Sequence, residues 1–174
     1  MAGFISDYYE TGKKVLLKPN DFFKEMPITG GYKNPLIFAI ITAVIMGVGL
    51  TIITLGVGFL AIIFAPIAVA ASIFLAALLL LVCAKIVGGT GSYEATMRVA
   101  SYANIVNVIG WIPVVSVIGS LYGLFLTVLG MKEIHKLTTT KAVIAVLIAI
   151  AIIFIIVVLL AIVGIGITGY VPAG

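Results

Sequence analysis

The stretch VASYANIVNVIGWIPVVSVIGSLYGLFLTVLGM, residues 99–131, decides the fold, because this charge-free interval fits either one membrane crossing or two. A helix needs about 20 apolar residues to cross a hydrocarbon core of about 30 Å. Basic residues near span ends stay in the cytoplasm. If the chain turns near Gly110–Pro113, all 10 Lys and Arg residues face one side, whereas a single crossing moves Lys132, Lys136 and Lys141 to the other. We therefore predict two crossings here.

The rest of the 174-residue chain has the same character. It is 63% hydrophobic and 9% charged, and its mean hydropathy is +1.36, so its polar residues are too few to cover a soluble globule. Charge-free intervals at 34–84 and 142–174 hold two crossings and one crossing. We predict an all-α polytopic membrane bundle of five transmembrane helices, with the N-terminus cytoplasmic and the C-terminus outside. The predicted membrane domain covers 34–174, with spans at about 35–56, 59–85, 92–109, 113–136 and 141–165.

Residues 1–33 are predicted to form a cytoplasmic or interfacial segment. They contain acidic residues and lack an apolar core of signal-peptide length. Apolar residues at 4, 5, 8, 9 and 15–17, with Lys13 and Lys14 beside them, suit an amphipathic interfacial helix that ends at Pro19. The expected interfacial anchors are aromatic: Phe4, Tyr8, Phe22 and Phe23. The segment either pads the bundle at headgroup level or senses the membrane and docks a partner.

The composition argues against an enzyme. The charge-free intervals hold no Asp, Glu, Lys, Arg or His, whereas pumps and ion-coupled transporters usually place such residues within the membrane. His135 is the only histidine and Cys83 the only cysteine, so the pair cannot build a metal site. We expect no catalytic residue, cofactor or metal, and a solvated or interfacial His135. Gly88–Gly91 lacks a phosphate-loop lysine and is predicted to be a tight loop.

Two groups of polar residues are candidate sites. The predicted topology gathers an inner-face cluster at the cytoplasmic ends of the third and fourth spans: Tyr93, Glu94, Arg98, Lys132, Glu133, His135 and Lys136. This cluster forms either an ion-pair network, for example Arg98 with Glu133, or a docking surface for a protein or anionic lipid. The third span carries an intramembrane polar face: Ser101, Tyr102, Asn104 and Asn107. That face either fastens helices by hydrogen bonds or lines a cavity for a lipid headgroup or small solute.

Three stretches carry a family resemblance. They are Gly88–Ala103 followed by Ile112–Pro113, then Gly130–Ala142, and Lys18–Met26 with Asn34–Pro35. Together they resemble the Yip (Ypt-interacting protein) domain family. The resemblance implies a five-span integral membrane protein with a cytoplasmic N-terminus. Eukaryotic members are linked to Rab-type GTPases and vesicle traffic, but the N-terminal region of about 33 residues is shorter here. The chain is more similar to the short prokaryotic members, which weakens the inference of GTPase binding.

These observations together predict a non-enzymatic membrane scaffold or adaptor with a role in membrane organisation or partner recruitment. The alternative is a channel or carrier for a small solute or lipid that uses the polar face of the third span. Expected partners are membrane lipids and other membrane or cytoplasmic proteins, with an oligomer allowed and no nucleic acid. The protein is expected in the cell membrane if prokaryotic, and in Golgi or ER membranes if eukaryotic.

Overall fold

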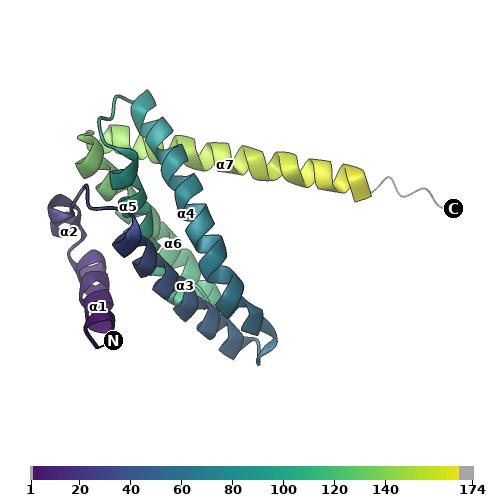
Figure 1. The fold of residues 1–174 in the computed structure, drawn as a ribbon. Helices are drawn as coiled ribbons and strands as arrows, with labels where there is room; N and C mark the ends of the chain where they lie inside the picture. The colour runs from purple at the N-terminus through teal and green to yellow at the C-terminus, as the bar shows by residue number, and fades with distance from the viewer. Residues whose placement is uncertain (1, 169–174) are drawn as a thin grey trace.

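The computed structural model describes the backbone of residues 2–168 and the side chains of residues 5–163. The side chain of Phe4 and the end of the predicted membrane domain, residues 169–174, lie outside these ranges. Every element in the described range is helical (Figure 1), which confirms the all-α prediction. The elements are α1 (Ala2–Leu17), α2 (Pro19–Glu25), α3 (Lys33–Ile53), η1 (Val57–Leu60), α4 (Ala61–Ile86), α5 (Tyr93–Ala103), η2 (Asn104–Ile109), α6 (Pro113–His135) and α7 (Thr139–Thr168).

Four stretches are long and apolar enough to cross a membrane: Lys33–Ile53, Val57–Ile86, Pro113–His135 and Thr139–Val163. The third predicted span does not meet this criterion. It consists of the 11-residue helix α5 and the six-residue 3-10 helix η2. The fifth crossing and the orientation of the chain therefore remain predictions.

Packing explains the polar character of α5 and η2. These two helices contact α3, α4 and α6, and the side chains of Met97, Val99 and Ser101 are completely buried. A helix surrounded by other helices does not need to be apolar on every face, because little of it meets lipid. The segment is the centre of the bundle.

Close helix contacts explain two glycines of α3. A Cβ at Gly47 would lie 2.9 Å from the backbone of Ala61, and a Cβ at Gly49 would overlap the Trp111 ring. The turn between α3 and α4 occurs where the first two predicted spans, 35–56 and 59–85, meet. Its residues Leu55 and Gly56 have positive φ angles of 51° and 93°.

Helix α7 packs on the bundle only through its first half. Ala142, Ala145, Val146 and Ala149 are buried, and the helix contacts α4 and α6. Beyond these residues α7 extends away from the other helices (Figure 1). From Ile153 to Val163 its side chains are exposed. An exposed surface of this length and apolarity suits contact with lipid.

Candidate functional site

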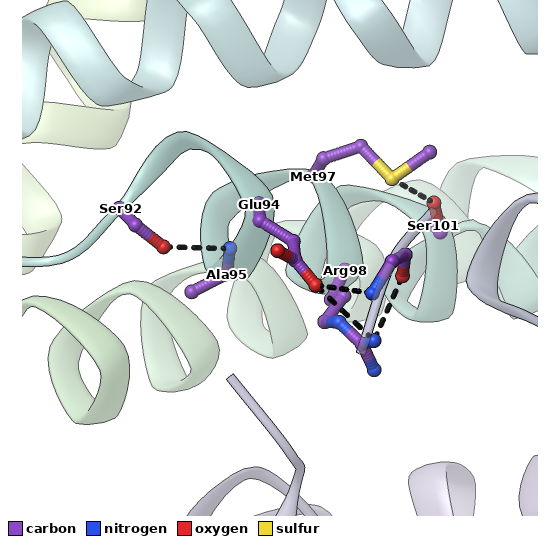
Figure 2. A network of polar contacts seen from close by, with 7 residues as sticks. Ser92, Glu94, Ala95, Met97, Arg98 and Ser101 are labelled. Atoms are coloured by element: carbon purple, nitrogen blue, oxygen red, sulfur yellow. Dashed lines mark hydrogen bonds and ion pairs between the residues drawn. The ribbon is translucent and has the colours of Figure 1, made fainter. Parts of the chain in front are cut away.

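Glu94 and Arg98 both form hydrogen bonds with the linker between α2 and α3. Ser92 caps α5, because its Oγ accepts a hydrogen bond from the Ala95 N–H at 3.2 Å. Within the first two turns of α5, the Glu94 carboxylate accepts from the Gly31 N–H at 2.6 Å, and Arg98 Nη2 donates to the Gly31 carbonyl at 2.8 Å. The two side chains also pair with each other at 3.4 Å (Figure 2). The linker is thereby tied to the central helix.

The backbone conformation at Gly31 favours glycine. Gly31 has a φ angle of 85° and its neighbour Gly30 one of 113°, a region that L residues rarely adopt. Arg98 is 5% exposed, and burying a charge costs free energy unless it is paired and hydrogen-bonded. We conclude that Arg98 and Glu94 are structural members of the inner-face cluster.

The ion pairs of the cluster are local. Arg98 pairs with Glu94, and Lys132 pairs with its neighbour Glu133 at 3.8 Å. The predicted ion pair between Arg98 and Glu133 is wrong, because the Arg98 side chain bonds Glu94 and the Gly31 carbonyl instead. The Tyr93 hydroxyl donates to the Phe74 carbonyl at 2.9 Å and so joins α5 to α4. The seven residues do not form one network.

His135 lies at the centre of a second contact set, and its expected solvation is wrong because it is completely buried. The Gly91 N–H donates to Nδ1 at 3.1 Å, which requires that nitrogen to be unprotonated. The proton of the neutral ring is therefore on Nε2, which donates to Thr96 Oγ1 at 2.9 Å. Thr96 in turn donates to the Ser92 carbonyl at 2.8 Å. The chain of bonds joins the end of α6 to the start of α5.

The predicted tight loop before α5 passes directly over this histidine. The Thr90 N–H donates to the His135 carbonyl at 3.1 Å. A Cβ at Gly91 would lie 2.8 Å from His135 Nδ1 and 2.8 Å from the Ile134 carbonyl oxygen. A Cβ at Gly89 would lie 2.9 Å from the Ala84 carbonyl oxygen. These two glycines are explained by contact with protein rather than with a phosphate.

The hydrogen bonds of the intramembrane polar face lie within its own segment, and one of its buried groups has no partner. Ser101 is completely buried and donates to the Met97 sulfur at 3.5 Å. Asn107 Nδ2 donates to the side-chain oxygen Oδ1 of Asn104. Asn104 Nδ2 is buried with no hydrogen-bond partner among the atoms described. The expected bonds between helices are not found for these residues. Tyr102, the fourth member, packs edge-on against the rings of Phe22 and Phe38.

The three described aromatic anchors, Tyr8, Phe22 and Phe23, pack against the bundle. Phe23 is 2% exposed and packs at Gly130, where an added Cβ would lie 3.1 Å from its ring. Phe22 meets Tyr102 with ring centroids 5.1 Å apart. The Tyr8 hydroxyl bonds Thr42 Oγ1 at 3.0 Å. The large exposed apolar side chains of α1 are instead Ile5, Tyr9, Leu16 and Leu17.

Sequence reasoning missed the partners of these residues. Thr96, Gly31, Phe38 and Thr42 carry the contacts of His135, Arg98, Tyr102 and Tyr8. None of the four has a charge or a local motif. The single usable signal is the pair of glycines at 30 and 31, which marks a linker with special backbone angles.

Exposed lysines surround the His135 contact set. Lys85 lies in the last turn of α4, Lys136 caps α6 and Lys141 lies in the first turn of α7, and all three are exposed. These helix ends lie together at one end of the bundle (Figure 1). Among the described residues the three lysines take part in no ion pair. We call them the inner-end lysines.

Four apolar helices of spanning length, three of which pack around a buried polar helix, define a polytopic helical membrane protein. A comparison with family models assigns the chain within this class, because the Yip1 domain matches residues 13–162. The chain therefore belongs to the Yip1 domain family, as its resemblance predicted. No curated protein and no solved structure matches it.

Proposed function

We propose that this Yip1-family protein is a non-enzymatic membrane scaffold or adaptor that presents the inner-end lysines to a partner protein. The proposal rests on one observation. Lys85, Lys136 and Lys141 come from three helices, yet they are exposed at the same end of the bundle, around a loop held by His135. A charged surface on a rigid frame favours recognition, because little side-chain and loop ordering remains to be done on binding.

The structure offers less support for transport. Among the described residues, two cavities beside the N-terminal helices are lined by neither Asn104 nor Asn107, and Tyr102 is the member of the polar face that lines the smaller one. These two side chains bond each other, and Ser101 is engaged with Met97. A pathway along the polar face would require these contacts to break. The scaffold is therefore the function that the geometry supports best.

Cross-linking in native membranes, followed by purification and quantitative mass spectrometry, tests the proposal. The variant is Lys85→Gln/Lys141→Gln. The control is Lys13→Gln/Lys33→Gln, which removes the same charge from exposed positions on α1 and α3. At about 1 kcal/mol per lysine, we expect recovery of the bound partner to fall roughly tenfold or more in the variant and to stay unchanged in the control. Equal recovery of the same partners by both proteins would contradict the scaffold.

A further inference from the structure

A cavity of about 250 Å³ lies between α1, α3 and α5. Helix α1 contributes Asp7, Tyr8 and Thr11, helix α3 contributes Asn34 and Phe38, and α5 contributes Tyr102. We call this space the headgroup cavity. None of the inner-end lysines lines it, so a ligand bound there would be independent of the proposed scaffold.

Three of the eight residues that line the headgroup cavity are aromatic, and their rings are in contact through Phe38. The Phe38 ring centroid lies 4.8 Å from that of Tyr8 and 5.1 Å from that of Tyr102. Thr42 donates its hydroxyl proton to the Phe38 carbonyl, so the Tyr8 hydroxyl must be the donor in its 3.0 Å bond to Thr42. Aromatic faces attract cations. A rigid aromatic lining therefore favours a positively charged group.

The polar groups of the cavity have the same preference. Asp7 is the only charged side chain in the lining, and in the part of the chain that the structure describes it forms no ion pair. The Thr11 hydroxyl and the Asn34 side-chain oxygen add further acceptors. An ammonium that carries N–H donors satisfies these oxygens better than a quaternary ammonium, which has none.

A second cavity, of about 410 Å³, adjoins the first, because Thr11 lines both. Its lysines, Lys14 and Lys18, come from α1 and the link to α2, whereas its acidic residues, Asp21 and Glu25, come from α2. Along α1 the sign of charge thus changes from Asp7 to Lys14. This order matches a ligand with an ammonium at one end and a phosphate next to it.

The position of the cavity relative to the membrane indicates the source of such a ligand. Helix α1 exposes Asp7, Glu10, Lys13 and Lys14, and charged side chains are costly in hydrocarbon. This length of α1 therefore lies outside the hydrocarbon. On the α3 side the lining also includes the apolar side chains of Ile37 and Ile41. The site can thus meet polar and apolar parts of one lipid.

We propose that the headgroup cavity binds phosphatidylethanolamine, with its ammonium between Asp7 and the rings of Tyr8, Phe38 and Tyr102. Lys14 and Lys18 hold the phosphate. The apolar edge of α3 borders the glycerol and the start of the acyl chains. The site selects for an N–H-bearing, zwitterionic headgroup.

Native mass spectrometry of the full-length protein with equimolar phosphatidylethanolamine, phosphatidylcholine and phosphatidylglycerol tests this site. The variant is Asp7→Asn. The matched control is Glu10→Gln, which removes the same charge from the same helix at an exposed position outside both cavities. We expect the wild type to retain phosphatidylethanolamine preferentially. An ion pair of about 1 kcal/mol predicts roughly fivefold lower retention in the variant and no change in the control.

Three results would overturn the proposal. The first is equal retention of phosphatidylethanolamine by Asp7→Asn and the wild type. The second is an equal loss in the Glu10→Gln control, which would indicate a general charge effect. The third is retention of phosphatidylglycerol or phosphatidylcholine as strongly as phosphatidylethanolamine. Because both substituted positions are exposed, circular dichroism should show that all three proteins fold alike.

Discussion

The loop over His135 can be tested by Gly91→Ala. The added methyl would lie 2.8 Å from His135 Nδ1 and 2.8 Å from the Ile134 carbonyl oxygen, closer than carbon normally approaches either atom. Relief of this contact moves the loop away and breaks the Gly91 N–H bond to Nδ1. Overpacking costs about 1–3 kcal/mol, and an unsatisfied buried ring nitrogen costs about 1–3 kcal/mol. Since the two effects overlap, we expect a loss of about 3 kcal/mol.

Thermal unfolding of the full-length protein in detergent measures this loss. At a fixed scan rate, about 3 kcal/mol corresponds to an apparent Tm lower by roughly 6–12 °C for a chain of this size. Gly119→Ala in α6 is the matched control, because its nearest neighbouring atom is an ordinary 3.5 Å away. That variant should be neutral or slightly stabilising, since alanine is the better helix former.

A double-variant cycle separates the histidine contact from the rest of the loop. In a His135→Ala background the close contacts of the added methyl with the imidazole ring are gone and the contact with the Ile134 carbonyl oxygen remains, so Gly91→Ala should cost at least about 1 kcal/mol less than in the wild type. The reasoning is refuted if Gly91→Ala leaves the Tm unchanged, or if Gly119→Ala lowers it equally.

Four other measurements probe the remaining contacts and the topology. Thr96→Val removes the acceptor of His135 Nε2 and should cost about 1–3 kcal/mol in thermal unfolding, with Thr96→Ser as the rescuing variant. Arg98→Met removes the hydrogen bond to the Gly31 carbonyl and should lower the free energy of unfolding by about 2 kcal/mol. Limited proteolysis between Met26 and Tyr32 should therefore accelerate, and an unchanged cleavage rate would contradict the role assigned to Arg98. Burial raises the pKa of the Tyr8 phenol above 10.0, so its contribution to stability is present below pH 10.0 and is lost as pH rises through the raised pKa. A difference titration of wild type against Tyr8→Phe checks this, and a Tyr8 pKa at or below 10.0 would contradict it. Lys14 and Lys136 should be labelled from the same face of a sealed vesicle, and labelling from opposite faces would overturn the predicted topology.

Local sequence signals predicted the helices well where chain neighbours decide the outcome. The break between the predicted spans 35–56 and 59–85 and the predicted helix start at 113 both appear in the structure. Each depends on backbone geometry within a few residues. The same holds for the apolar helices, since the absence of charge over a long interval leaves hydrocarbon as the suitable solvent.

The candidate site was predicted less well, because burial depends on distant parts of the chain. The Tyr122 hydroxyl bonds the Leu16 carbonyl 106 positions away, and Arg98 bonds Gly31 67 positions away. No pattern around Phe23 indicates that Gly130 leaves room for its ring. Phe22, Phe23 and His135 therefore look from the sequence like interfacial residues, whereas the fold packs them into the bundle.

The amino-acid sequence alone specifies a lipid-embedded helical chain of the Yip1 family, because hydropathy and charge spacing are properties of composition along the chain. Tertiary packing alone decides that α5 and η2 are enclosed by other helices, that His135 is buried in its neutral form, and that α1 and α3 enclose a cavity beside Asp7. The physical reason is that solvation of a side chain is set by whatever packs against it. Those contacts form only when segments far apart in the chain come together.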